Sequence, residues 1–317
     1  TDISSQYYNS AYMNSYYNSY YSGMYGYGMY NYGNYNSYEN YYDPDKSIQM
    51  YGLSVMFGKR LKWPDDYFQF TAELSFQRYV LSDWQYFPVT NGKCNNLSLN
   101  LTLARASYDN PIYPRMGSDF SFSLQITPPY SLFDGKDYSK YNQNNQDDMN
   151  EIHKWIEYHK WSGKIAVFTK LVGDLVLMTR AQFGYLGYYN RDLGYSPFEG
   201  FLVGGDGMSG YSTYGSEVIS LRGYDNYSLT PVVDGAYAGN VYDKFTLELR
   251  YPVILQPSST IYALVFLEGG NCWADIRDFN PFEIKRSAGI GLRVMLPVVG
   301  LLGVDWGYGF DSTDDNK

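Results

Sequence analysis

Basic residues are scarce in this sequence, which has 24 Lys and Arg against 33 Asp and Glu, a net charge of -9 and a pI near 4.7. Nucleic acids are bound mainly through clustered Lys and Arg, and the chain has no basic patch, so we expect no nucleic-acid partner. Long apolar runs are also missing, since none approaches the about 18 residues that suggest a transmembrane helix. A helical membrane protein is therefore excluded, whereas a membrane barrel built from strands is not.

Residues suited to chemical catalysis or metal binding are few. The chain has two histidines, His153 and His159, and neither shows the Asp, His or Cys spacing of a metal site. The glycine-rich stretch 204–215 lacks the Lys-Ser or Lys-Thr ending and the following helix of a phosphate-binding loop. We therefore expect both histidines to be loop residues, solvated or lightly packed, and we expect no enzyme activity, no metal and no cofactor.

Tyrosine is abundant: the chain has 38 Tyr and 31 Gly, with 19% aromatic residues and a mean hydropathy of -0.41. A water-soluble core does not need so many amphipathic rings, whereas the interface between a membrane and water is enriched in them. Residues 1–46 are a low-complexity run of Tyr, Asn, Ser and Gly. Two interpretations stay open for this run: a disordered tail, or a large extracellular loop whose rings cover a neighbouring protein.

Apolar and polar residues alternate along most of the chain after residue 46. In 68–77, for example, Phe, Phe, Ala, Leu and Phe alternate with Gln, Thr, Glu, Ser and Gln. A period of two indicates strands whose side chains point alternately to the two faces of a sheet. The pattern predicts ten strands, at 47–57, 68–77, 97–104, 120–127, 161–171, 175–188, 244–251, 260–269, 287–296 and 301–310.

The predicted connections alternate between short and long. Those at 61–66, 110–117 and 173–174 are short, and those at 83–96, 130–157 and about 189–242 are long. A β-sandwich also alternates in polarity, but segments of about ten residues with short turns at one end and long loops at the other are typical of a transmembrane barrel. We therefore predict an all-β fold in which 47–317 is part of a transmembrane antiparallel β-barrel.

Cys94 and Cys272 are the two cysteines of the chain, and both fall in predicted long loops. A disulfide between them would require an oxidising compartment. Because sequence spacing cannot decide the pairing, a disulfide and a pair of free thiols both stay open.

The longest connection, at about 189–242, is rich in glycine and contains the sequence Leu221-Arg222-Gly223-Tyr224. Loops longer than about 12–15 residues without regular structure are usually functional or disordered. The alternation predicts that Lys244, Thr246, Arg250 and Asp305 point to the inside of the barrel, as do the carboxylates of Glu248 and Glu268. We therefore expect this loop to fold inward, so that Arg222 forms charge-assisted hydrogen bonds with both carboxylates. The alternative is a solvated loop arginine.

Three motifs resemble the BamA-type outer-membrane protein assembly factors. Leu221-Arg222-Gly223-Tyr224 is similar to the Val-Arg-Gly-Phe/Tyr loop motif of that family. The segment from Glu268 through Gly269, Gly270, Asn271 and Cys272 to Trp273 is similar to its Asp-Ala-Gly-Asn-x-Trp strand motif, with Glu in place of the usual Asp. Residues 246–252, which include Glu248, resemble the strand that follows the loop. The three motifs occur in the family's order.

The resemblance implies a barrel of about sixteen strands, of which this chain would hold the sixth to the fifteenth. Residues 1–46 would then lie in an extracellular loop, and the chain would be a piece of a longer polypeptide whose lateral seam lies outside it. The implied function is to fold and insert β-barrel proteins into the outer membrane of a Gram-negative bacterium, without a cofactor. The implied partners are the lipid bilayer, unfolded outer-membrane clients and accessory subunits, for which 1–46 is a candidate contact.

Two other functions are compatible with the sequence. One is a polypeptide-export pore of the two-partner-secretion type, which belongs to the same superfamily and also has the arginine loop. The other is a passive, Tyr-rich barrel that captures a ligand at the cell surface. A buried Arg222 with inward carboxylate partners argues against the passive barrel, whereas an exposed Arg222 would favour it.

Overall fold

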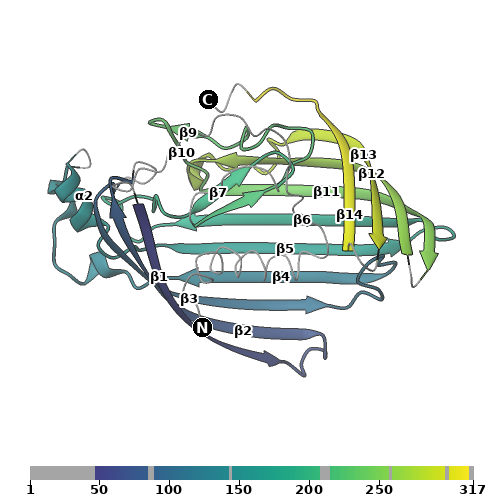
Figure 1. Cartoon of the computed structure of the whole chain (residues 1–317), viewed down its shortest axis with the longest axis horizontal. Helices are drawn as coiled ribbons and strands as arrows, with labels where there is room; N and C mark the ends of the chain where they lie inside the picture. The colour runs from purple at the N-terminus through teal and green to yellow at the C-terminus, as the bar shows by residue number, and fades with distance from the viewer. Residues whose placement is uncertain are drawn as a thin grey trace.

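The computed structural model describes residues 47–84, 89–142, 145–207, 215–256, 259–296 and 300–313. Ten strands form one antiparallel sheet in the order β1-β2-β3-β4-β5-β6-β11-β12-β13-β14 (Figure 1). They are β1 (Ser47–Arg60), β2 (Phe68–Ser82), β3 (Gly92–Ala106), β4 (Gly117–Ile126), β5 (His159–Lys170), β6 (Val176–Gly187), β11 (Val241–Gln256), β12 (Ser259–Trp273), β13 (Lys285–Leu296) and β14 (Gly300–Gly309). The predicted all-β fold and its ten main strands are confirmed.

Strand β11 shows how the two faces of the sheet differ. Phe245, Leu247 and Leu249 are 43%, 46% and 40% exposed on the outer face. Between them, Thr246 and Glu248 are 1% and 5% exposed on the inner face. Apolar side chains that face outward and polar side chains that face inward are the pattern of a barrel strand bordered by lipid. The period of two therefore arises because lipid lies outside this sheet and a polar interior lies inside it.

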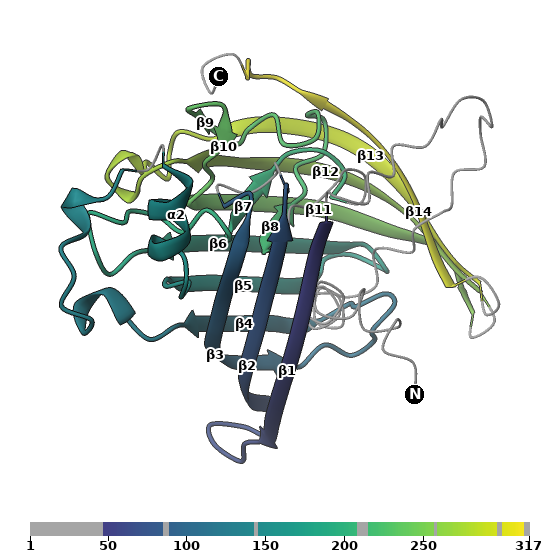
Figure 2. The ribbon, with the colours of Figure 1, turned by 60° about the vertical axis from the view of Figure 1, so that its left-hand side comes forward.

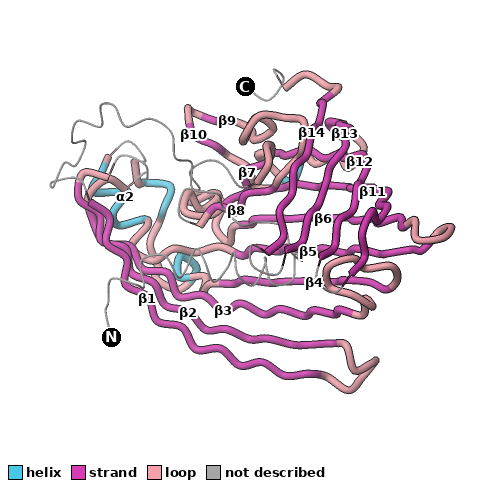
Figure 3. The backbone as a smooth tube through the Cα atoms, turned by 45° about the vertical axis from the view of Figure 1, so that its right-hand side comes forward, coloured by secondary structure: helices cyan, strands magenta, loops and turns pink. Residues whose placement is uncertain are grey.

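The described parts of the segment between β6 and β11, residues 188–207 and 215–240, lie on the concave side of the curved sheet, as Figures 1 and 3 show. It contains β7 (Gly200–Val203) and β8 (Ser216–Ile219), which pair in parallel, and the hairpin of β9 (Val232–Val233) and β10 (Ala236–Tyr237). The ring of Phe201 on β7 packs edge-on against Tyr242 on β11, with centroids 4.8 Å apart. This segment therefore lies inward of the sheet, and it contains short strands that the sequence pattern did not predict. We call residues 188–240 the inserted segment.

The connection between β4 and β5 folds into a cap at one end of the sheet (Figure 2). It contains η2 (Tyr130–Leu132), η3 (Tyr138–Lys140) and α2 (Gln146–Ile152). The side chain of Asn145 accepts a hydrogen bond from the backbone N–H of Asp147 and so caps the start of α2. Ile152 belongs to a buried hydrophobic cluster that also contains Phe201 of the inserted segment. The cap, residues 127–158, therefore shares one core with the inserted segment.

Both cysteines lie on strands, so their predicted placement in loops was wrong. Cys94 is on β3 and Cys272 is on β12, and β4, β5, β6 and β11 separate these two strands in the sheet. Both are buried free thiols, and the structure does not contain the disulfide that the sequence left open. The strands extend further than predicted because backbone pairing continues where the alternation of polarity ends, for example between Tyr79 and Cys94.

The Tyr-rich run 1–46 lies outside the described residues. Within the described ranges, no helix is long and apolar enough to cross a membrane.

Candidate functional site

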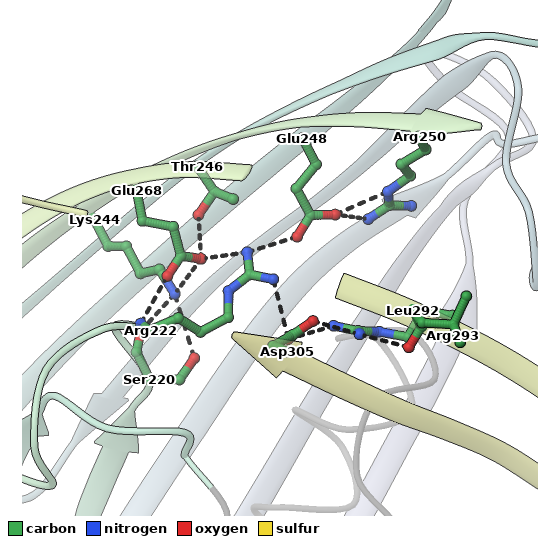
Figure 4. Close-up of polar contacts among 10 residues, drawn as sticks. All are labelled: Ser220, Arg222, Lys244, Thr246, Glu248, Arg250, Glu268, Leu292, Arg293 and Asp305. Atoms are coloured by element: carbon green, nitrogen blue, oxygen red, sulfur yellow. Dashed lines mark hydrogen bonds and ion pairs between the residues drawn. The ribbon is translucent and has the colours of Figure 1, made fainter. Parts of the chain in front are cut away.

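The side chain of Arg222 extends from the inserted segment to the inner face of the sheet, where it contacts three carboxylates (Figure 4). Its Nη2 donates to Oε1 of Glu248 at 2.7 Å and to Oε1 of Glu268 at 2.8 Å. Its Nη1 donates to Oδ2 of Asp305 on β14 at 3.2 Å. The Arg222 side chain is 13% exposed. The structure thus brings together the arginine and both glutamates that the sequence placed inside, and it adds a third carboxylate.

Each of these carboxylates has a second cationic partner. Arg250 donates from Nε and Nη2 to Oε2 of Glu248 at 2.9 and 2.6 Å. Lys244 lies 3.2 Å from Oε1 of Glu268. The remaining cation is Arg293, which forms a bidentate pair with Asp305 through two bonds of 2.6 Å. The result is one network of cations and carboxylates that connects the inserted segment to β11, β12, β13 and β14.

Register and strand alternation place these side chains side by side. In the antiparallel pair of β11 and β12, Thr246 lies opposite Glu268, and Glu248 lies opposite Phe266. Thr246 also donates from Oγ1 to Glu268 at 3.2 Å. The centre of the Arg222 guanidinium lies 3.7 Å from the centroid of the buried Phe266 ring, which adds a cation–π contact to the ion pairs.

Gly223 brings the backbone of the inserted segment directly against β14. Its φ is +92°, a conformation that favours glycine, and a Cβ there would lie 2.8 Å from the carbonyl carbon of Tyr308. The next residue, Tyr224, donates from its hydroxyl to the backbone oxygen of Arg286 at 2.7 Å. On the other side of Arg222, the Leu221 side chain is fully buried. The four residues of the loop motif therefore all contact the sheet or its immediate surroundings.

Gly270 of the strand motif, near the end of β12, leaves space for the Leu221 side chain of the loop motif. A Cβ on Gly270 would lie 3.0 Å from Cδ1 of Leu221 and 2.5 Å from the backbone oxygen of Asp243, so only glycine fits without a shift. Asn271 donates from Nδ2 to the backbone oxygen of Glu283 at 2.9 Å. Trp273 packs edge-on against Phe279, with centroids 4.9 Å apart. Asn271 and Trp273 therefore hold the connection from β12 to β13.

Gly269 precedes these residues on β12 and lies beside that same connection. A Cβ on Gly269 would lie 3.0 Å from Cδ1 of Ile284. Ile284 comes directly before β13. Gly269 therefore leaves space for the chain as it enters β13.

This network is suited to holding a backbone conformation. Charge-assisted hydrogen bonds in a partly desolvated interior fix geometry, and removing one member leaves buried charge unpaired at a cost of about 3–5 kcal/mol. Among the described residues, no group of His, Cys, Asp and Glu could hold a metal ion. The ion pairs and hydrogen bonds of Arg222 support electrostatic positioning of the inserted segment.

The sequence pattern predicted that several side chains of the network point inward, but it did not predict which residues they contact. The alternation predicted that Lys244, Arg250 and Asp305 point inward, but their contacts with the arginine network were not foreseen. Arg293 was not identified as a site residue. These contacts could have been expected from the charged residues at inward positions of predicted membrane strands, because a charge buried within a membrane protein needs a partner.

Both histidines were predicted to be loop residues with little packing; His153 does lie in the connection between β4 and β5, whereas His159 lies on a strand, and both are packed. His153 follows α2, and its ring packs edge-on against Phe198 of the inserted segment, with centroids 5.5 Å apart. His159 begins β5 and accepts a hydrogen bond at Nδ1 from Nε1 of Trp161 at 2.9 Å. Both imidazole rings therefore pack against neighbouring side chains at one end of the sheet.

The outward apolar strands and the arginine bound on the inner face define a class, membrane β-barrels with a polypeptide segment anchored inside. The chain matches the Omp85 superfamily domain over residues 3–317, and it belongs to this superfamily. This membership confirms the family resemblance that the motifs indicated.

The fold is also similar to a solved structure, the crystal structure of BamA from Haemophilus ducreyi lacking POTRA domains 1–3. The TM-score is 0.57, the sequence identity is 16%, and the match covers 84% of this chain and 52% of that chain. This chain therefore spans about half the length of that BamA chain. A comparison with curated proteins gives no match.

Proposed function

We propose that this chain is part of the central barrel of an outer-membrane assembly machine that folds and inserts β-barrel proteins. The observation that carries the proposal is the bonding of Arg222 to Glu248, Glu268 and Asp305 on the inner face of an Omp85-superfamily sheet. A network of this kind holds a long segment in one position inside a barrel. Such a barrel would act from the outer membrane of a Gram-negative bacterium.

In this proposal no residue acts as acid, base or nucleophile, and no ATP or cofactor takes part. The protein lowers the barrier to insertion by thinning the bilayer and by offering a strand edge as a template for client strands. Backbone hydrogen bonds satisfied at such an edge remove the main cost of placing an unpaired strand in lipid. The Arg222 network would keep the inserted segment fixed while the barrel wall rearranges. The partners are lipid, unfolded outer-membrane clients and accessory subunits.

An export pore of the two-partner-secretion type is the second candidate, because it shares the superfamily and the arginine loop. The passive surface-binding barrel is less well supported, because its prediction of an exposed Arg222 conflicts with the 13% exposure of that side chain. The insertase and the export pore differ in how many different proteins depend on them.

Depletion of the intact protein in its own cell separates these functions. If several unrelated outer-membrane β-barrels fall together and their unfolded forms collect in the periplasm, the protein is an insertase. If a single secreted partner is lost while other barrels stay at normal levels, the protein is an export pore and the proposal is wrong. If neither changes and only surface binding is lost, the passive barrel is the right function.

A further inference from the structure

A second buried charge cluster lies at the start of the inserted segment, apart from Arg222. Nζ of Lys160, on the inner face of β5, lies 3.2 Å from Oε2 of Glu199 and 3.9 Å from Oε2 of Glu217. The same Nζ donates to the backbone oxygen of Gly215 at 3.4 Å. The side chains of Lys160 and Glu199 are each 9% exposed. One lysine therefore contacts both limbs of the parallel pair formed by β7 and β8, since Glu199 precedes β7 and Glu217 lies on β8.

Tyr158 connects this cluster to the cap. Its ring is fully buried, and its hydroxyl lies beside the carboxylate of Glu199, with which it interacts electrostatically. The hydroxyl oxygen also accepts from Nε2 of Gln125 at 2.7 Å and from Nδ2 of Asn96 at 3.3 Å. Glu199 therefore lies between Tyr158 of the cap and Lys160 of β5, and its ion pair is with Lys160.

The ammonium group of Lys160 also lies close to an aromatic ring. Nζ of Lys160 lies 5.0 Å from the centroid of the Phe201 ring on β7. A cation close to an aromatic ring and away from water gains more from the ring than an exposed cation does. The ammonium group is therefore surrounded by elements of the inserted segment on several sides.

We propose that Lys160 is a positioning residue that forms a second anchor for the inserted segment, with Glu199 as its main partner. The Arg222 network fixes the far end of the segment to β11, β12 and β14, whereas Lys160 fixes its near end to β5, next to the cap. The two clusters have no residue in common among their described contacts. Loss of the Lys160 contacts should therefore increase the motion of β7, β8 and the cap, while the hydrogen bonds of the Arg222 network stay intact. The consequence for insertion rests on the proposed function.

Amide hydrogen exchange on the intact protein in lipid nanodiscs tests the anchor directly. The variant Lys160→Met removes the charge and keeps most of the length of the side chain. We expect amides in 199–203, 215–219 and 127–158 to exchange at least about tenfold faster, because buried Glu199 loses its cation. The amide of Arg222, which donates to Glu268, should keep its wild-type rate. Lys140→Met is the matched control, since its ion pair with Asp137 leaves the lysine side chain 78% exposed.

Two outcomes would overturn the proposal: wild-type exchange in all three regions, or equal acceleration at the Arg222 amide, which would mean that the segment opens as one unit. Folding of each variant is checked by the shift in gel mobility on heating. If Lys160→Met does not fold, Glu199→Gln, which breaks the same ion pair from the other side and leaves Lys160 3.9 Å from Glu217, is measured by the same exchange experiment with the same two criteria.

Client insertion is measured separately on the same proteins. If the proposed function holds, Lys160→Met should slow insertion, and Lys160→Arg, which restores the charge, should recover most of the rate. Equal insertion by Lys160→Met and the wild type would overturn the part of the proposal that gives the anchor a role in activity. Exchange reports the anchor whether or not the protein is an insertase, so failure of the proposed function in the depletion experiment is distinguishable from failure of the anchor.

Discussion

Glu268 accepts hydrogen bonds from both the backbone and the side chain of Arg222. Its Oε2 accepts from the backbone N–H at 2.9 Å, and its Oε1 accepts from Nη2 at 2.8 Å. The side chain of this carboxylate is 2% exposed, so solvent offers little replacement for either bond. One strand residue therefore sets the backbone position of the inserted segment and the direction of its arginine together.

Replacing Arg222 should release the far end of the inserted segment. Arg222→Ala leaves Glu248, Glu268 and Asp305 with fewer cations, and the expected loss is about 3–5 kcal/mol in the free energy that holds the segment closed. Arg222→Lys should recover only part of it, because an ammonium group is a point charge and cannot reproduce the planar fork of a guanidinium. Amide exchange in 215–224 measures both variants.

The control for Arg222 is Arg277→Ala. Arg277 pairs with Asp275, but its side chain is 81% exposed, and such surface pairs contribute about 0–1 kcal/mol. A comparable loss of protection in Arg277→Ala and Arg222→Ala would mean that burial of the network does not determine its strength.

Glu268→Gln tests whether the two bonds to Arg222 act together. A neutral amide has one acceptor oxygen, so it can replace only one of the two bonds and offers Lys244 no charge. We expect a loss of about 2–4 kcal/mol, and the double variant with Arg222→Ala should cost clearly less than the sum of the single variants. A double-mutant cycle measured by exchange checks this. Strict additivity would show that the two residues do not depend on each other.

The period of two predicted the inner face of the sheet well because each strand must present lipid-compatible side chains on one side only. On β11 it placed Thr246 and Glu248 inside, and both are buried there. The pairing of Arg222 with Glu268 was also expected, because a long loop with an arginine needs an inward carboxylate. These predictions required only local pattern and the strength of buried charge.

Other features depend on register and curvature, which the pattern does not contain. The alternation predicted that the Asp305 side chain points inward. Its hydrogen bond with Arg222 could not be predicted, because it depends on the curvature that brings β14 to the inserted segment. Cys272 was assigned to a loop because the sequence Gly-Gly-Asn-Cys has no alternation, yet it pairs with Tyr242 within β12 and β11. The parallel pair of β7 and β8 was missed because strands of four residues are too short to show a period.

Gly223→Ala should displace the inserted segment from β14. The left-handed φ of +92° disfavours alanine, and its Cβ would lie 2.8 Å from the carbonyl carbon of Tyr308 and 2.9 Å from the backbone nitrogen of Gly309. Backbone atoms of a paired strand cannot move aside, so strain of about 1–3 kcal/mol adds to the steric conflict. Exchange at the amides of 221–224 should rise relative to the wild type.

Gly194→Ala separates these two effects. Gly194 lies in the same inserted segment with a φ of +69°, and a Cβ there would meet nothing within 4 Å. This variant should carry the conformational strain alone, and its effect should stay local to 190–196. An effect of Gly223→Ala no larger than that of Gly194→Ala would contradict the role of the contact with β14.

The cap should loosen as the pH falls. Burial lowers the pKa of His153 from 6.5 to about 4, so the folded cap holds this imidazole neutral. Between pH 6.5 and 4 the opened cap binds a proton that the closed cap does not, and stability therefore decreases as the pH falls through this window. At pH 5 we expect a loss of about 1–2 kcal/mol relative to pH 7. Amide exchange in 145–158, corrected for the intrinsic pH dependence of exchange, measures it.

His153→Phe provides the matched variant for this effect. Phenylalanine keeps an aromatic ring against Phe198, whose centroid lies 5.5 Å from that of His153, and it does not titrate. The neighbouring carboxylate of Glu157 is already bonded to the backbone N–H and hydroxyl of Ser131 at 2.8 and 2.6 Å, so it is not free to stabilise a charged imidazole. The cap of His153→Phe should therefore lose little protection between pH 7 and 5. Equal loss in the variant and the wild type would assign the pH dependence to another group of the cap.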